Sequence, residues 1–201
     1  MYSFLLVLLA YLLGSINSAI IVCKLAGLPS PRTVGSGNPG ATNVLRLGSK
    51  KAAAFTLAGD VIKGLIPVLW GHFLDLPAAI LAWIAFAAVL GHVFPLYFKF
   101  QGGKGVATAF GGLFALNFFL GLAVGALWLV TAKISRYSSL SSLICMALMP
   151  FIALAFLGKW SFPPLFLITI LIFIRHRSNI HKLLHGQESK IGKKNDVCQK
   201  K

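Results

Sequence analysis

A glycine-rich stretch at residues 35–46, "GSGNPGATNVLR", combines residue types that bind phosphate. Glycines allow consecutive backbone N–H groups to form a nest around an anion, and Arg46 can hold a phosphate through two parallel hydrogen bonds. The side chains of Ser36, Asn38 and Asn43 add neutral donors. The stretch is therefore a candidate anion site, although a tight connecting turn would also need its glycines.

The spacing of Gly35, Gly37 and Gly40 also matches the G-x-G-x-x-G pattern of dinucleotide sites, with Asp60 twenty residues beyond Gly40. That pattern has meaning only after a buried strand and at the start of a helix. Here the preceding segment, residues 2–22, is an apolar run far too long for a strand. We therefore expect no dinucleotide cofactor.

A second basic loop, "KFQGGKGVAT", surrounds Lys104 with glycine. Lys104 would be a point charge between the backbone donors of Gly102, Gly103 and Gly105. The loop is not a Walker A motif, because Gly105 stands where that motif needs Ser or Thr. Two basic glycine-rich loops in one small chain favour a phosphate site over two unrelated turns.

The composition is that of an integral membrane protein. Of the 201 residues, 57% are hydrophobic and only 11% are charged, and the mean hydropathy is +0.82. Soluble domains carry roughly a quarter charged residues. We expect one transmembrane domain over residues 1–186 and a flexible basic tail over residues 187–201, with the lipid bilayer as a partner and no nucleic-acid partner.

The three cysteines, Cys23, Cys145 and Cys198, have neither a C-x-x-C spacing nor that of metal ligands. They are most simply free thiols. We therefore expect neither a metal site nor a bound cofactor.

Six apolar segments are candidates for membrane helices, each of which needs about 20 residues to cross the hydrocarbon core. They are Tyr2–Val22, Ala52–Leu74, Ala78–Phe98, Val106–Ala132, Leu140–Leu157 and Trp160–Ile174. The fourth is ambiguous. It would be about 40 Å long as one helix, yet it is too short for two complete spans.

The positions of Lys and Arg resolve this ambiguity, because these residues concentrate in cytoplasmic loops. If the fourth segment crossed once, Lys133 and Arg136 would lie on the opposite side from the basic tail. If it enters and returns, all basic clusters lie inside and only Lys159 lies outside. The sequence thus predicts an all-α, multi-pass bundle of about seven helical elements, two of them short or re-entrant, with the N-terminus outside and the C-terminus in the cytoplasm.

The polar stretches all fall on the predicted cytoplasmic face. A transporter usually places its key polar groups near the midplane of the bilayer, whereas the predicted helix interiors here are almost free of them. This distribution suits a reaction between a water-borne and a lipid-borne substrate. A small transporter or channel for an organophosphate remains the alternative from another class.

Five motifs follow one another from Leu12 to about Glu188: "YLLGSINSAIIVCK", "GSGNPGATNVLR", "GDVIKG", "GHVFPLYFKFQGGKGVAT" and "RHRSNIHKLLHGQE". Their order and content resemble those of the bacterial acyl-phosphate-dependent glycerol-3-phosphate acyltransferases. Asn17 departs from the family's usual "GSIP", and Pro39 occupies a variable position. Neither is a predicted anion-binding residue.

The resemblance implies transfer of a fatty acyl group from acyl phosphate to the 1-hydroxyl of sn-glycerol 3-phosphate, giving lysophosphatidic acid and phosphate for phospholipid synthesis. It also implies a multi-pass enzyme of the bacterial inner membrane with its active site facing the cytoplasm. The enzyme that makes acyl phosphate is a further candidate partner. No histidine of this chain has an aspartate five residues on, so the H-x-x-x-x-D acyltransferases do not fit.

The roles of single residues are carried over from the family motifs. Ser36 and Arg46 are expected to hold the phosphate of glycerol 3-phosphate, with Asn38 and Asn43 shaping the loop. Lys104 is expected to contact acyl phosphate or to bridge the two phosphates. The predicted catalytic residues are Lys104, Ser36, Arg46, His176 and Asn179, and the predicted substrate-binding residues are Gly35, Ser36, Gly37, Asn38, Asn43, Arg46, Gly102, Gly103, Lys104, Gly105 and Ser139.

Other polar residues have simpler explanations. Asp60 and Lys63 could be an ion pair at the start of a helix, and His92 could mark a helix end at the membrane interface. His181 and His185 are expected to be exposed. An acyl-CoA-dependent enzyme is excluded only by the resemblance.

Overall fold

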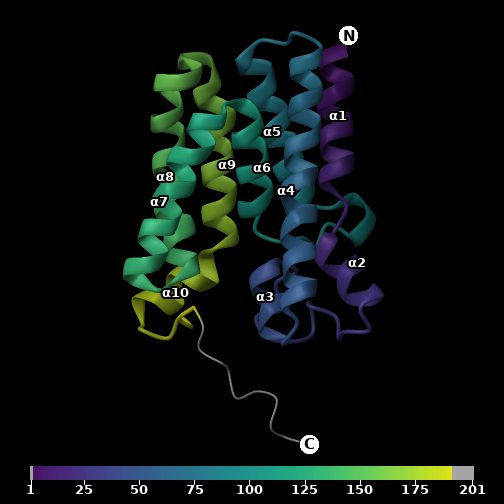
Figure 1. Ribbon diagram of the computed structural model, residues 1–201, viewed down its shortest axis with the longest axis vertical. Coiled ribbons are helices and arrows are strands. Elements are labelled where there is room, and N and C mark those ends of the chain that lie inside the picture. Colours follow the sequence, from purple (N-terminus) through teal and green to yellow (C-terminus); the bar gives the residue numbers. More distant parts are fainter. Residues whose placement is uncertain (1, 192–201) are drawn as a thin grey trace, which may run out of the picture.

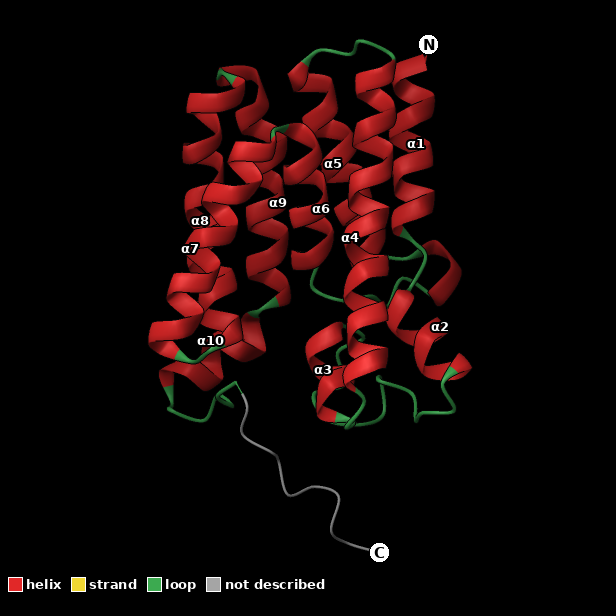
Figure 2. Ribbon diagram, in the orientation of Figure 1, coloured by secondary structure: helices red, strands yellow, loops and turns green. Residues whose placement is uncertain are grey.

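The computed structural model describes residues 2–191, which form helices and loops without a strand (Figures 1 and 2). The α-helices are α1 (Tyr2–Gly14), α2 (Ser18–Leu25), α3 (Ala41–Arg46), α4 (Lys50–Phe73), α5 (Ala78–Val93), α6 (Val106–Leu116), α7 (Phe118–Ser135), α8 (Ser138–Leu157), α9 (Phe162–Arg175) and α10 (Arg177–Leu184). Two 3₁₀-helices, η1 (Leu96–Phe98) and η2 (Lys159–Ser161), complete the elements. The predicted all-α membrane class is confirmed.

Seven of these helices run along the long axis of the bundle, namely α1 and α4 to α9, while α2, α3 and α10 gather at the end opposite to Tyr2 (Figure 1). Five stretches are long and apolar enough to cross a membrane, and the first of them joins α1 and α2 as Tyr2–Leu25. The seven helices along the bundle agree with the expected count of about seven helical elements. The short helices α2, α3 and α10 are additional.

A break between α1 and α2 was not foreseen in the first apolar segment. Gly14 ends α1 where it meets the backbone of Ala88 in α5, and a Cβ at Gly14 would overlap the Ala88 carbonyl. Asn17 then caps α2, since its Oδ1 accepts from the N–H of Ile20 at 3.2 Å. The residue that departs from the family's proline is thus a helix cap.

The fourth apolar segment enters the bundle as α6 and returns as α7 (Figure 1), as predicted. Asn117 makes the turn in extended conformation and caps α7, accepting from the N–H of Leu120 at 3.0 Å. Of the two elements predicted to be short, only α6 is short, with 11 residues. The other, α7, has 18 residues and is long enough to be a candidate span.

The short helix α6 is packed closely against α4. A Cβ at Gly64 of α4 would overlap the Thr108 carbonyl of α6, and a Cβ at Gly111 of α6 would overlap the Val61 carbonyl of α4. Irregular backbone is tolerated at membrane depth only when protein or a cavity surrounds it. This close approach of two helices therefore explains how the chain can turn back inside the bundle.

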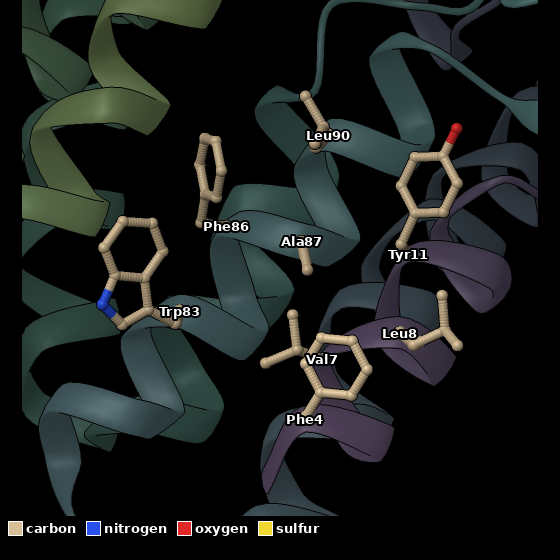
Figure 3. A pocket seen from close by; sticks show the side chains of 8 residues that line it. All are labelled: Phe4, Val7, Leu8, Tyr11, Trp83, Phe86, Ala87 and Leu90. Carbon is tan, nitrogen blue, oxygen red and sulfur yellow. The ribbon is translucent and has the colours of Figure 1, made fainter.

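The outer surface is rich in large apolar side chains, as lipid contact requires. A groove of about 340 Å³ between α1 and α5 is lined by Phe4, Val7, Leu8, Tyr11, Trp83, Phe86, Ala87 and Leu90 (Figure 3). Its walls are almost wholly apolar, and none of the predicted site residues lines it. The groove therefore lies apart from the predicted site residues.

The basic links between helices lie at one end of the bundle. The α7–α8 link is fixed there by two contacts with the segment after α10: the N–H of Ile191 donates to the Arg136 carbonyl at 2.7 Å, and the Lys190 ammonium lies over the Tyr137 ring. Among the described residues, Lys159 is the one basic residue in the two links at the opposite end. Which end faces the cytoplasm stays a prediction.

Residues 187–191 of the predicted tail contact the helical domain, and residues 192–201, with Cys198, lie outside the described residues. The boundary at residue 186 and the flexibility of the tail stay predictions.

Candidate active site

The first glycine-rich loop is folded around the buried side chain of Asn43, in α3. Its Oδ1 accepts from the N–H of Ser36 at 2.9 Å, and its Nδ2 donates to the carbonyls of Pro31 at 2.8 Å and Val34 at 3.0 Å. This geometry supports the role of Asn43 in shaping the loop. It also occupies the Ser36 N–H, so a ligand would meet the exposed Ser36 hydroxyl instead.

Two glycines of this loop have the left-handed backbone that favours glycine. Gly35 has φ +66° and Gly37 has φ +70°. A Cβ at Gly35 would also overlap Oδ1 of Asn43, whereas one at Gly37 would only touch the Arg32 carbonyl at 3.4 Å. These glycines therefore do form a tight turn. A turn does not exclude the predicted anion site, because it sets the shape of the loop that a ligand would meet.

The second loop packs against the end of α5. The N–H of Gly102 donates to the Val93 carbonyl at 3.1 Å, and that of Gly103 donates to the His92 carbonyl at 3.2 Å. The guanidinium of Arg175, in α9, donates to the carbonyls of Gly102 at 2.8 Å and Gly103 at 3.2 Å. Substrate contact by these glycines stays a prediction, but both N–H groups are already paired, so the glycines first hold the loop that carries Lys104.

The two loops contact each other. Arg32 of the first loop donates to the carbonyls of Phe98, at 3.1 Å, and Gln101. The Pro39 carbonyl lies 3.1 Å from the place that a Cβ of Gly103 would take. The structure thus joins two motifs that lie about sixty residues apart in the sequence.

Lys104 enters a hydrogen-bond network that joins four segments. Its ammonium donates to Oδ1 of Asn179, in α10. Nδ2 of Asn179 donates to Oε1 of Glu188 at 2.9 Å, and the buried Ser139 hydroxyl, in α8, donates to the same oxygen at 3.0 Å. Lys104, Asn179 and Ser139 were predicted site residues, and the structure brings them together.

Burial lowers the pKa of Lys104 from 10.5 to about 8; Glu188 opposes this shift, and Arg46, Arg175 and Lys182 add to it. Arg46 of α3 is thus one of the cations whose charge acts on Lys104. Lys104 and these three cations outnumber the single carboxylate, so the region has a net positive charge. Such a region favours anionic ligands.

His176 lies buried between α9 and α10, with Nδ1 2.8 Å from the Ile172 carbonyl. A ring nitrogen that faces a carbonyl must carry the proton, so Nε2 of the neutral ring is an acceptor. Burial, followed by the charge of Lys104, lowers the pKa of His176 to about 4. His176 is therefore neutral at physiological pH.

The remaining predicted residues lie on the same loops. Asn38 is half-buried in the first loop, and Gly105 has φ +88° where α6 begins. Sequence reasoning missed two members of the site, Arg175 and Glu188, although both lie in the quoted last motif. The sequence did contain a signal for Glu188: the chain has only four acidic residues, so a carboxylate inside a basic motif is unusual here.

Two of the simpler explanations are confirmed only in part. Asp60 and Lys63 form an ion pair at 2.9 Å, but it is buried in the middle of α4 and includes His92 of α5, whose Nδ1 lies 3.5 Å from Asp60. His92 lies in the last turn of α5, so the helix end is confirmed; its side chain is buried in the protein, and its position at the membrane interface stays a prediction. His181 and His185 are exposed, as expected.

Comparison with known proteins agrees with the arrangement of motifs. The family model described as glycerol-3-phosphate acyltransferase matches residues 4–186. A glycerol-3-phosphate acyltransferase of Thioalkalivibrio sulfidiphilus is 55% identical over 190 residues, which are 94% of this chain and 94% of the relative. One of Legionella pneumophila is 50% identical over 195 residues, 96% of this chain and 70% of the relative.

The fold is that of a solved membrane enzyme. The crystal structure of PlsY, an integral membrane glycerol 3-phosphate acyltransferase, in its glycerol 3-phosphate form superposes with a TM-score of 0.89 at 39% identity, covering 96% of each chain. Its lysophosphatidic acid form gives a TM-score of 0.87 at 38% identity, with the same coverage. On sequence, fold and motif geometry together, this chain belongs to the glycerol-3-phosphate acyltransferase family.

Proposed function

We propose that this chain transfers a fatty acyl group from acyl phosphate to the 1-hydroxyl of sn-glycerol 3-phosphate, giving lysophosphatidic acid and inorganic phosphate. The observation that carries the proposal is the convergence of both glycine-rich loops and the α8–α10 network around Lys104, at the basic end of a membrane bundle. The names of the relatives and the glycerol 3-phosphate form of PlsY support the acceptor.

In the proposed complex, Ser36 and Arg46 hold the phosphate of glycerol 3-phosphate. Lys104 contacts the phosphate of the donor or bridges the two phosphates. Its half-buried ammonium suits this role, because electrostatic attraction is stronger in a partly water-excluded site than in bulk water. Asn179 and Ser139 act with Glu188 to orient that ammonium.

The proposed reaction needs no cofactor, because acyl phosphate is already activated. The 1-hydroxyl oxygen attacks the acyl carbonyl carbon, and the bond from that carbon to the phosphate oxygen breaks. The hydroxyl proton passes to the departing phosphate, which acts as the base. Lys104 stabilises the negative charge that develops, while neutral His176 offers Nε2 as a hydrogen-bond acceptor for a substrate hydroxyl.

We also propose that the enzyme lies in a bacterial inner membrane with this site facing the cytoplasm, because its end of the bundle carries the basic links. Residues 1–186 would form the acyltransferase domain, and residues 187–201 a basic tail of which Glu188 serves the site. The enzyme that makes acyl phosphate is a proposed partner.

One assay tests the function. The purified protein is given glycerol 3-phosphate with either palmitoyl phosphate or palmitoyl-CoA, and lysophosphatidic acid is measured. Product from palmitoyl phosphate alone is expected. Product from palmitoyl-CoA would overturn the donor, whereas uptake of glycerol 3-phosphate into vesicles without any product would indicate the transporter alternative.

A further inference from the structure

A buried cluster of charged and titratable side chains lies outside the proposed reaction. Asp60 and Lys63, on α4, form an ion pair of 2.9 Å, and Nδ1 of His92, on α5, lies 3.5 Å from the same carboxylate oxygen. Their exposed fractions are only 2%, 6% and 6%. Ionisable residues inside a membrane protein are costly and are therefore a sign of function.

One arm of this cluster reaches the break in the first span. Nζ of Lys63 donates to the carbonyl of Ile16 at 2.6 Å. Ile16 lies between α1 and α2, where helix-terminal carbonyls need partners from outside the helix. Lys63 thus ties the middle of α4 to the segment from which α2 and the first glycine-rich loop continue.

The other arm reaches the second loop. The His92 carbonyl accepts from the N–H of Gly103 at 3.2 Å, and the His92 ring lies directly beside the same residue, since a Cβ at Gly103 would overlap Nε2. The Pro39 carbonyl lies on that side as well. The His92 ring therefore supports Gly103 where the two loops meet, one residue before Lys104.

A stabilising role alone explains this cluster poorly. Replacing a buried ion pair with apolar residues is often neutral or stabilising, and buried apolar side chains of both helices, such as Val68 of α4 and Ile84 of α5, belong to the same core. We infer that Asp60 and Lys63, acting through His92, position the Gly102–Lys104 loop so that the Lys104 ammonium meets the reacting phosphate. They are positioning residues, since none of them is among the residues proposed to hold the substrates, and the inference rests on the proposed acyl transfer.

The first test is His92→Ala. Small misplacements of a catalytic group can cost about a hundredfold in rate, so we expect kcat to fall by about tenfold or more. KM for glycerol 3-phosphate should change by less than about threefold, because Ser36 and Arg46 are untouched. The control is His72→Ala, an exposed histidine that also lies in the last turn of a helix and contacts a carbonyl, that of Ala115, at 2.8 Å. The kcat of this variant should stay native.

The second test measures coupling between His92 and Gly103. Gly103→Ala alone adds a methyl group that overlaps the His92 ring, whereas His92→Ala makes room for it. The double variant should therefore be more active than the product of the two single losses. Independent losses that simply multiply would overturn the inference, even if each single variant is impaired.

The third test removes both charges together. Asp60→Asn with Lys63→Gln keeps hydrogen-bonding groups at both sites and leaves no uncompensated buried charge. We expect kcat to fall by about fivefold or more in protein whose melting temperature in detergent is near native. Native kcat in this variant would overturn the role of the ion pair. If the variant does not fold, the coupling between His92 and Gly103 still tests whether His92 positions the second loop, and losses there that simply multiply would overturn the inference. If the native chain itself makes no lysophosphatidic acid, the proposed function fails. If the native chain is active and only these variants behave otherwise than expected, the inference alone fails.

Discussion

At the scale of single residues, the site depends on how cations are presented. Lys104 is half-buried and donates to Asn179, which Glu188 holds in turn, whereas Arg46 lies in α3 and acts on Lys104 through its charge. An ammonium is a compact charge, and a guanidinium is a planar fork with two parallel donors. The two cations therefore make separate predictions.

For Arg46→Lys, we expect KM for glycerol 3-phosphate to rise by about tenfold or more, since hydrogen bonds to charged groups contribute about 1.5–3 kcal/mol. KM for acyl phosphate should change little. Steady-state kinetics with each substrate varied in turn measures both constants. Equal losses for both substrates would point to a structural role of Arg46 in α3.

The pH dependence of activity should report the state of Lys104. Its pKa is lowered to about 8, so the ammonium is mostly charged at pH 7 and is neutralised as the pH rises through 8. The rate should therefore fall above about pH 8. In Glu188→Gln the carboxylate that raises the pKa of Lys104 is lost, so the alkaline limb should move to lower pH. An unchanged limb would show that another group titrates.

At the scale of helices, close packing decides whether the chain can turn back inside the membrane. The α4–α6 contact uses Gly64 and Gly111 because any side chain there would overlap the facing backbone. At the turn, the Asn117 side chain caps α7 and the Asn117 N–H donates to the Leu113 carbonyl of α6 at 3.0 Å. This contact carries a prediction about stability.

Gly111→Ala should destabilise the protein, because overpacking typically costs about 1–3 kcal/mol. A lower melting temperature in detergent is the expected result. Gly125→Ala is the control, since a Cβ there would come no closer than 4.0 Å to Phe114. Equal stability of the two variants would show that α6 and α4 can move apart without cost.

At the scale of the whole molecule, the bundle places one basic face at one membrane surface. In Figure 1, α7 returns to the end that carries α3 and α10. The contact between Ile191 and Arg136 ties the segment after α10 to the α7–α8 link. The first glycine-rich loop, the loop that carries Lys104 and the segment from α10 to Glu188 are therefore expected to face the same aqueous compartment.

This topology predicts the accessibility of introduced cysteines. A cysteine near Lys133 or Arg136, or near Lys190, should react with a membrane-impermeant thiol reagent only from the cytoplasmic side. Labelling can be compared in intact cells and in inverted vesicles. Reaction of the 133–136 site from outside would mean that the fourth segment spans fully.

The sequence by itself determined the membrane class and the approximate number of long elements, and it predicted site residues of which the structure brings Lys104, Asn179 and Ser139 together. These properties depend on local quantities, since hydropathy over about 20 residues identifies a span and glycine, lysine and arginine within one short motif predict a phosphate site. The returning fourth segment could also be predicted, because the charges of Lys133 and Arg136 constrain it.

Only the tertiary structure decided which groups meet and which are already occupied. The N–H groups of Gly102 and Gly103 pair with α5, Glu188 closes the network around Lys104, and Asp60 joins His92 across two helices. None of this could be inferred from spacing, because each contact joins segments that approach only when helices pack. Burial is likewise a property of the whole fold. Because Asp60 and Lys63 are buried, this i,i+3 pair of α4 also contacts His92 of α5 and the Ile16 carbonyl between α1 and α2.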